Sequence, residues 1–236
     1  MLCTCATHAP GVCKVEKTLG GHTGVGKKVI VTIVNNHFKT ITPEGGETQA
    51  QLLEMIAGSV AACRLCYLCD GRTNTVPGYG NPEARVMLIG EAPGKNEDLQ
   101  GKPFVGAAGK YLTELLDYAG LTREEVFIGN VLKCRPPSNR NPQPDEISLC
   151  APFLRDQVRA IGPEYIVTMG NFATKFILRT DRGITKLHGR LEQTGRFKVF
   201  PVFHPAAAIY DRSKREVLEE DFRTLSEFLR SDTQHA

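Results

Sequence analysis

The sequence lacks the apolar segments that membrane insertion or export requires. No apolar run approaches the roughly 18 residues of a membrane-spanning helix, and the most suggestive stretch is the short Val29–Val34. The N-terminus has no basic region followed by an apolar secretory segment. No internal repeat or low-complexity tract is present either. We therefore expect no membrane span, no export signal and no repeat architecture.

A strong charge of one sign is also missing. The chain of 236 residues has 29 Lys and Arg against 26 Asp and Glu, a net charge of +3, which neither requires nor opposes a nucleic-acid partner. Its 41% hydrophobic and 23% charged residues are enough to bury a core, which excludes global disorder. The length suits one α/β domain with an appendage.

Cysteine, in contrast, is abundant, with 8 residues in the chain. A protein without an export signal seldom uses cysteines in disulfides, so metal ligation or redox chemistry is favoured. Cys63, Cys66 and Cys69 are spaced as Cys-x2-Cys-x2-Cys, and Cys134 and Cys150 follow later. Four thiolates suit either zinc or an iron–sulfur cluster, and the residues alone do not separate the two. Three cysteines also compete for the first two ligand positions.

Residues 1–48 differ from the rest of the chain. They contain scattered cysteines (Cys3, Cys5, Cys13) and one short β-like run, and we expect a poorly ordered N-terminal extension outside the core. The segment from Gly21 to Lys28 resembles a phosphate-binding loop, but Lys28 stands where that motif has Ser or Thr. A β-like run follows it, whereas the motif must open a helix. We interpret this segment as a flexible loop.

From residue 49 to residue 236, short apolar strands alternate with amphipathic helices. Strands are expected over Arg85–Gly90, Val126–Gly129, Tyr165–Met169 and Lys198–Phe203. Helical spacing of apolar residues precedes the first strand, separates the others and closes the chain. The pattern predicts a three-layer α/β/α fold with a central, mainly parallel four-stranded sheet. Ligands bind such sheets at the carboxyl ends of the strands.

The unusual residues fall at these strand ends and suit a nucleobase pocket. Asn130 follows the second strand, and its amide can donate to a carbonyl and accept from a ring N–H, which distinguishes uracil from cytosine. Phe104 is placed to stack on the base, and His204, after the fourth strand, to stabilise a leaving base. No acidic residue occurs over 133–140, so the cations there are candidate phosphate contacts, namely Lys133, Arg135 and Arg140.

These motifs resemble those of the type 4 uracil-DNA glycosylases, the iron–sulfur branch of the uracil-DNA glycosylase superfamily. The resemblance runs from about Cys63 to the C-terminal helix and rests on Cys-x2-Cys, GEAPG, G-x-P-F-V-G, N-x-x-K-C-R-P-P-x-N-R and HPA. It implies flipping of uracil out of DNA and hydrolysis of its N-glycosidic bond. It also implies a structural [4Fe-4S] cluster rather than zinc, with Cys69 as an extra cysteine. The implied ligands are Cys63, Cys66, Cys134 and Cys150.

The resemblance also assigns roles within the pocket. The implied catalytic residues are Glu91, Asn130 and His204, and the implied uracil-binding residues are Gly90, Glu91, Ala92, Glu97, Phe104, Asn130 and His204. Glu97 is a candidate for excluding the thymine methyl group. The loop from His204 to Arg212 would press into the duplex, with Ile209 or Tyr210 as the wedge. Ala92 stands where the type 1 branch has the Asp of GQDPY, so rate enhancement should come mostly from stabilising developing charge.

Two other functions stay open at this point. One is a superfamily member that binds uracil covalently, although this chain has GEAPG rather than GEQPG and no basic insertion before His204. The other is a metal-stapled nucleic-acid-binding module without catalysis. The resemblance favours the glycosylase, a monomer acting on uracil-containing DNA in the cytoplasm of a prokaryotic cell, associated with the nucleoid.

Overall fold

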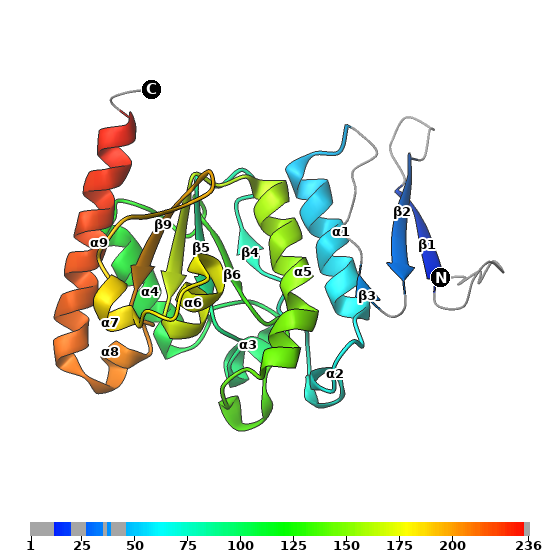
Figure 1. The fold of residues 1–236 in the computed structure, drawn as a ribbon, viewed down its shortest axis with the longest axis horizontal. Coiled ribbons are helices and arrows are strands. Elements are labelled where there is room, and N and C mark those ends of the chain that lie inside the picture. The colour runs from blue at the N-terminus through cyan, green and yellow to red at the C-terminus, as the bar shows by residue number, and fades with distance from the viewer. Residues whose placement is uncertain (1–11, 20–26, 35–36, 39–45, 234–236) are drawn as a thin grey trace.

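The computed structural model describes residues 12–19, 27–34, 37–38 and 46–233. Its central sheet has six strands in the order β4-β6-β5-β7-β9-β8. The inner four are mutually parallel and correspond to the four predicted strands: β6 (Phe127–Asn130), β5 (Val86–Gly90), β7 (Tyr165–Met169) and β9 (Phe197–Val202). The predicted three-layer fold is confirmed (Figure 1).

The predicted count of four strands is incomplete. Two short strands, β4 (Tyr79–Gly80) and β8 (Glu192–Thr194), add to the edges of the sheet in antiparallel orientation. They have 2 and 3 residues, which is too short to show an alternation of apolar and polar side chains. They pair with β6 and β9 and leave the parallel centre unchanged.

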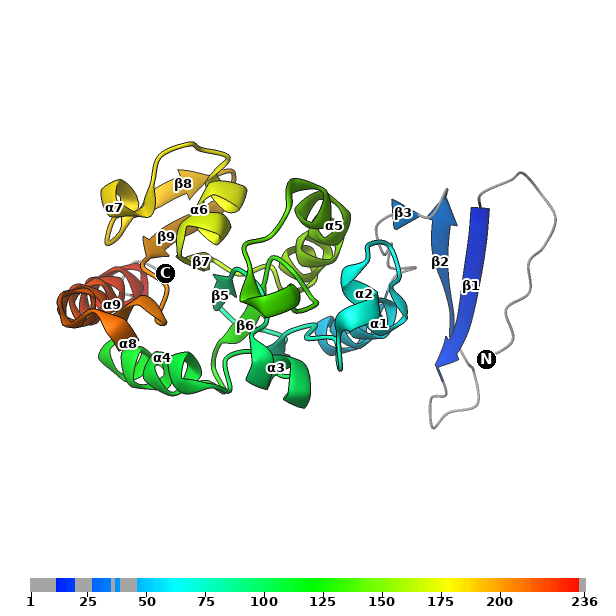
Figure 2. The same cartoon turned by 90° about the horizontal axis from the view of Figure 1, so that it is seen from below.

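Helices cover both faces of the sheet because alternate residues of its strands point to opposite sides. Val86 and Leu88 of β5 pack in one cluster with α4 (Ala107–Tyr118) and α9 (Arg212–Thr233). Met87 and Ile89 pack in another with α5 (Pro144–Ile161) and α6 (Asn171–Leu178), and α1 (Gln49–Ala62) packs on α5. Figure 2 shows the two helical layers on either side of the strands.

Local signals set where the helices begin and end. Thr48 and Gln51 form a capping box at the start of α1. At α5, Gln143 and Glu146 form the equivalent pair, Pro144 occupies the first turn, and Gly162 ends the helix in the left-handed conformation. The predicted closing helix is α9, and its buried apolar residues are Leu218, Phe222, Leu225 and Leu229. No helix among the described residues is long and apolar enough to cross a membrane.

A separate three-stranded antiparallel sheet precedes this domain, formed by β1 (Val12–Leu19), β2 (Lys27–Val34) and β3 (His37–Phe38). The predicted β-like run lies in β2 and is confirmed. A strand rather than a helix therefore follows the phosphate-loop-like segment, whose residues 21–26 lie outside the described ranges, as do Cys3 and Cys5. The interpretation of residues 1–48 as a poorly ordered extension stays a prediction.

Short helices gather where the parallel strands end. They are α3 (Lys95–Gln100), the 3-10 helix η1 (Pro137–Asn139), α7 (Ile184–Leu187) and α8 (Ala207–Tyr210). A further short helix, α2 (Leu68–Gly71), lies beside the end of α5 that carries Cys150. Figure 1 shows α3, α7 and α8 at the same edge of the sheet. Figure 2 looks at that edge from below. Loops from several strands can therefore build one site there.

Candidate active site

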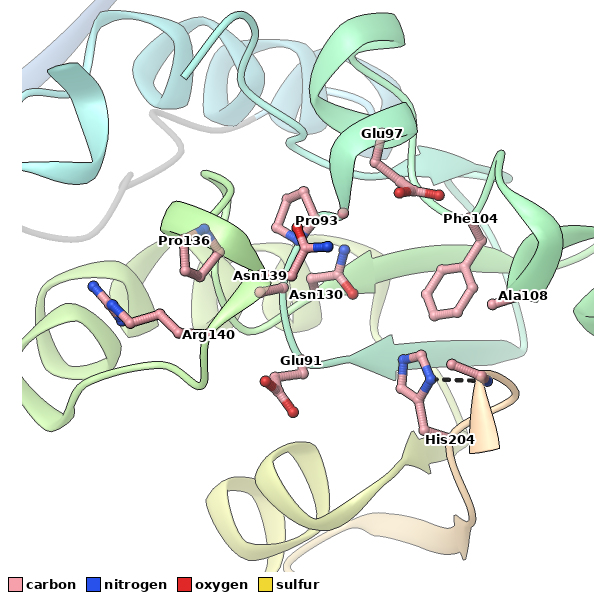
Figure 3. Close-up of a pocket in the computed structure, with 13 residues that line it drawn as sticks. Glu91, Pro93, Glu97, Phe104, Ala108, Asn130, Pro136, Asn139, Arg140 and His204 are labelled. Carbon is pink, nitrogen blue, oxygen red and sulfur yellow. Dashed lines mark hydrogen bonds between the residues drawn. The ribbon is translucent and has the colours of Figure 1, made fainter. Parts of the chain in front are cut away.

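A cavity of about 330 Å³ opens at the carboxyl edge of the sheet (Figure 3). Gly90 ends β5 and Asn130 ends β6, and the two residues are paired in the parallel register. The residues that line the cavity come from the loops after β5, β6 and β9: Glu91, Ala92, Pro93, Gly94, Glu97, Phe104, Ala108, Asn130, Pro136, Asn139, Arg140, His204 and Ala206. The structure therefore brings together most of the pocket residues that the sequence predicts.

Asn130 presents an unpaired acceptor inside this site. Its side chain is 2% exposed, and Oδ1 has no hydrogen-bond partner among the described residues. A buried acceptor without a donor costs about 1–3 kcal/mol. Gly90 makes room for it, because a Cβ there would lie 2.4 Å from Asn130 Oδ1 and 2.9 Å from Phe104 Cζ. A ligand that donates to Asn130 Oδ1 would remove this cost.

Phe104 is held over the cavity by Glu97. Phe104 has a φ of 51°, in the left-handed region that a bulky side chain rarely adopts. The carboxylate of Glu97 accepts from the backbone N–H groups of Val105 (2.9 Å) and Gly106 (3.0 Å) and so fixes the next two residues. The Phe104 ring stacks against His204, with ring centroids 5.6 Å apart. Glu97 thus anchors the aromatic wall of the cavity, a role that the sequence analysis missed.

The surroundings of His204 favour the neutral form of its imidazole. Burial lowers the pKa of His204 to about 4. Its Nδ1 accepts from the backbone N–H of Ala206 at 3.2 Å, so the proton of the neutral ring is on Nε2. A neutral N–H donor in a buried site stabilises a developing oxyanion without adding a positive charge of its own.

Two carboxylates line the cavity, and they differ in their surroundings. Glu97 is held by two backbone amides. Burial raises the pKa of Glu91, the residue that follows β5 directly. Ala92 next to it has no ionisable group, as the sequence indicates. Glu91 is therefore the carboxylate that is available to a bound ligand or to a water molecule.

The predicted DNA contacts have different surroundings. Arg140 lines the cavity but binds Glu146 at 2.6 and 3.0 Å, an ion pair that lowers the pKa of Glu146 to about 2. Arg135 donates to Asn139 Oδ1 at 2.7 Å. Ile209 on α8 is 46% exposed, as a wedge should be, whereas the side chain of Tyr210 lies outside the described residues. Roles for these residues in DNA binding stay predictions.

The structure corrects the predicted role of Lys133. Its side chain is 1% exposed, and Nζ donates to the backbone oxygen of Asn130 (2.8 Å) and to Gln157 Oε1 (2.6 Å). Burial lowers the pKa of Lys133 to about 8. The prediction of a phosphate contact is therefore wrong for Lys133. A Lys in a basic segment is ordinarily exposed, and its partner Gln157 belongs to a distant helix, so the sequence contained no local signal of its burial.

Four of the five described cysteines outside the N-terminal sheet line a second, small apolar cavity: Cys63, Cys66, Cys134 and Cys150. Cys69 does not line it, which agrees with the predicted ligand set. Arg72 Nη1 donates to Cys134 Sγ at 3.1 Å, and burial raises the pKa of the Cys150 thiol to about 12. Within the described part of the chain, no group of three or more His, Cys, Asp or Glu is arranged to hold a single metal ion.

The same four thiols are of the type and number that an iron–sulfur cluster requires. Such clusters are held by four Cys thiolates. The thiols come from three separate segments and face one apolar space, and none is in a disulfide. The donor set therefore suits the cluster that the resemblance implies.

Some lining residues were not singled out from the sequence. Pro136 and Asn139 belong to the loop around η1, where Ser138 and Asn139 have φ values of 53° and 54°. Figure 3 shows Asn139 among the residues that line the cavity with Asn130. The available signal was the Pro-Pro-Ser-Asn run, which is typical of a tight turn.

Comparison with known proteins agrees with this geometry. The profile of the Uracil DNA glycosylase superfamily matches residues 77–229. A type-4 uracil-DNA glycosylase of Saccharolobus solfataricus is 46% identical over 194 residues, which cover 76% of this chain and 87% of that protein. A type-4 uracil-DNA glycosylase of Thermotoga maritima is 41% identical over 189 residues, covering 78% of this chain and 98% of that protein. The chain therefore belongs to the uracil-DNA glycosylase superfamily and to its type-4 branch, as its motifs predict.

Proposed function

We propose that this protein is a DNA repair enzyme that removes uracil from DNA. It binds uracil-containing DNA, flips the nucleotide out of the stack and hydrolyses the N-glycosidic bond, leaving an abasic site. The observation that carries the proposal is the buried, unpaired Oδ1 of Asn130 in a cavity whose walls include Phe104 and His204. Both relatives described above are named type-4 uracil-DNA glycosylases.

Asn130 selects the base by hydrogen bonding. Its Oδ1 accepts from the ring N3–H of uracil, and its Nδ2 donates to the adjacent carbonyl oxygen O4. Cytosine has an amino group in place of that carbonyl and no proton on N3. The Nδ2 donor of Asn130 would therefore face the amino donor of cytosine, and the Oδ1 acceptor would face the N3 acceptor. Phe104 stacks on the flipped ring. Glu97 supports this wall and is our candidate for excluding the thymine methyl group.

His204 assists departure of the base. When the bond from N1 of uracil to the sugar C1′ breaks, the electron pair stays on uracil, and negative charge develops on its O2. The neutral Nε2–H of His204 donates to that oxygen. A water molecule adds its oxygen to C1′ and releases a proton to solvent, and the departed uracil anion takes up a proton from solvent. Glu91 is the lining carboxylate available to orient this water. Stabilisation of the leaving anion is the main source of rate enhancement, because Ala92 supplies no carboxylate.

DNA meets the cavity along the carboxyl edge of the sheet. The loop that begins at His204 carries the exposed Ile209, which fills the gap left by the flipped nucleotide. Arg135 and Arg140 contact the phosphate backbone, and Glu146, Tyr67 and the Asn141 carbonyl hold the Arg140 guanidinium group in place. We propose that the enzyme acts as a monomer. We also propose that it acts on DNA of the nucleoid, in the cytoplasm of a prokaryotic cell.

Cys63, Cys66, Cys134 and Cys150 would hold a [4Fe-4S] cluster in the second cavity. The cluster would supply a structural cross-link between the end of α1, the loop after β6 and α5. Arg72, which donates to Cys134 Sγ and to the backbone oxygen of Cys63 at 2.9 Å, supports two of the ligand segments. Burial raises the pKa of each of these thiols. The positive charge of bound iron would offset this effect, because a thiol loses its proton when it ligates a metal.

The proposal is tested on oligonucleotides that carry a single uracil, thymine or cytosine. Wild-type protein followed by alkali should cleave only the uracil strand. Asn130→Asp, which replaces the Nδ2 donor by an oxygen, and His204→Ala, which removes the Nε2 donor, should each lower kcat/KM by about 100-fold or more. No abasic sites with wild-type protein would overturn the glycosylase function. Adducts that survive denaturing electrophoresis would show the covalent binder instead.

A further inference from the structure

Lys133 forms a closed polar bridge beneath the candidate active site. Two hydrogen bonds, at 2.8 Å to the backbone oxygen of Asn130 and at 2.6 Å to Gln157 Oε1, use its ammonium group in a space that excludes water. Removing an ammonium group from water costs several kcal/mol. An apolar side chain of the same length would fill this volume without that cost, so packing alone does not account for a lysine here.

The bridge continues through Gln157 to a third part of the chain. Gln157 on α5 is 1% exposed, and its Nε2 donates to the backbone oxygen of Pro77 at 2.6 Å, just before β4. The bridge passes close to the backbone of β6, because a Cβ on Gly129 would lie 3.8 Å from Lys133 Nζ and 4.0 Å from Gln157 Oε1. It therefore joins the end of β6 to a long helix and to the edge of the sheet.

The backbone of Lys133 is fixed as firmly as its side chain. Its N–H donates to Cys150 Sγ at 3.3 Å, and its oxygen accepts from Val76 N at 2.8 Å. The intervening residues Val131 and Leu132 donate to the backbone oxygens of Gly90 and Glu91, both at 3.0 Å. The segment from Asn130 to Lys133 is thus anchored at both ends. The side chain of Lys133, the last residue of the segment, also donates to the backbone oxygen of Asn130, the first residue.

The residue that receives this bridge is the one that reads the base. A hydrogen bond to the carbonyl of Asn130 fixes its peptide plane at the point where β6 ends and the ladder with β5 stops. The direction of its Cα–Cβ bond follows from that plane, and so does the position of the amide group in the cavity. Among the described residues, no hydrogen-bond donor reaches Oδ1 to orient the amide from the cavity side.

We propose that Lys133 is a positioning residue, and that the bridge from Gln157 through Lys133 to the carbonyl of Asn130 sets the orientation in which Asn130 binds uracil. This inference rests on the proposed function and extends it to two residues outside the cavity. It replaces the phosphate contact expected from the sequence. The two roles predict different kinetics, because a phosphate contact acts on DNA binding and the bridge acts on the chemical step.

The first test is Lys133→Met, which keeps an unbranched side chain only one atom shorter and removes its donors. Single-turnover excision of uracil should slow by about 10- to 100-fold, the range expected when a reactive group is displaced by about 1 Å. The Kd for uracil DNA and its salt dependence should stay as in wild type, whereas loss of a phosphate contact would reduce the slope by about one. Lys175→Met, an exposed lysine on α6, is the matched control and should leave both measurements unchanged.

A double-mutant cycle shows whether Lys133 acts through Asn130. In an Asn130→Ala background, Lys133→Met should slow excision by less than about twofold, because the group that it positions is already absent. The full single-mutant effect in that background would overturn the proposal. A lowered Tm with an unchanged rate would do so as well, since it would show a role in stability only.

Gln157 provides the same test if Lys133→Met does not fold. Gln157→Glu keeps the acceptor for Lys133 Nζ and loses the donor to the Pro77 oxygen, whereas Gln157→Leu loses both contacts. Gln157→Leu should slow excision by about 10-fold or more, and Gln157→Glu should be at least about threefold faster than Gln157→Leu. Equal rates for the two variants would contradict the bridge.

Visible absorption of the iron–sulfur cluster and Tm are recorded for every variant. If wild type itself releases no uracil, the proposed function fails; if wild type is active and the variants match it, only the bridge is wrong.

Discussion

Gly90 and Asn130 face each other across the ends of two parallel strands, and a Cβ on Gly90 would lie 2.4 Å from Asn130 Oδ1. The absence of a side chain at one strand end is therefore what admits the amide group at the other. The same Cβ would lie 2.9 Å from Phe104 Cζ, so this glycine leaves room for two walls of the cavity at once.

Gly90→Ala should inactivate the enzyme by displacing Asn130 and Phe104. Overpacking of this kind costs about 1–3 kcal/mol of stability, and the displaced amide should lower kcat/KM for uracil excision by about 100-fold. Gly58→Ala on α1 is the control, since a Cβ there meets nothing within 4 Å. It should raise the free energy of unfolding by about 0.5–1 kcal/mol with no change in rate. An active Gly90→Ala enzyme would show that Asn130 is not held as described.

The fold could be predicted from the sequence because its inner strands are buried on both faces. Such strands are continuous apolar runs, and Tyr165–Met169 was predicted with its observed boundaries. The edge strands β4 and β8 could not be found, because they exist only through pairing with β6 and β9. The cavity could also be predicted, because its motifs follow the strands directly and the carboxyl ends of parallel strands lie at one edge of the sheet.

What the sequence could not predict depends on partners that are far apart along the chain. Lys133 is buried because Gln157, on α5, supplies an acceptor for its ammonium group. Glu97 holds the Phe104 loop because that loop turns its backbone amides toward α3. In both cases the residue type suggested contact with substrate, and the tertiary structure uses the side chain to support a neighbour.

His204 should make stability depend on pH in a defined window. The unfolded chain takes up a proton on this imidazole as the pH falls through about 6.5, whereas burial lowers the pKa of His204 in the folded protein to about 4. Between these values the unfolded state binds more protons, so this contribution to stability is present above about pH 6.5 and is lost as the pH falls toward 4. His204→Gln should remove this part of the dependence, which thermal unfolding across the window would show.

The same residue should leave activity flat near neutral pH. Because the neutral imidazole is the active form, kcat/KM of wild type should show no break at about pH 6.5, the ordinary pKa of histidine. Single-turnover rates on uracil DNA between about pH 7.5 and 5.5 are the measurement. A tenfold loss per pH unit below about 6.5 would mean that His204 titrates as an exposed residue and that burial does not set its charge.

Cysteine substitutions should separate the cluster ligands from the cysteine beside them. Cys150→Ser should abolish the visible absorption of the iron–sulfur cluster and lower Tm, because a metal-bound thiolate contributes folding energy. Cys69→Ser should keep both, since Cys69 does not line the cavity shared by the other four thiols. Iron and sulfide analysis of the two purified proteins is the second measurement. Loss of the cluster in Cys69→Ser with retention in Cys66→Ser would reverse the assignment.

Ile209 should matter for duplex DNA more than for single-stranded DNA. A wedge offsets the unstacking of a base pair, which costs a few kcal/mol and is absent when the target strand is unpaired. Ile209→Ala should therefore lower kcat/KM on a uracil–guanine duplex by about 10-fold or more and change it by less than about threefold on the single strand. The side chain is 46% exposed in the free protein, so Tm should not change. Equal losses on both substrates would place Ile209 in general DNA binding and leave the wedge to another residue of the same loop.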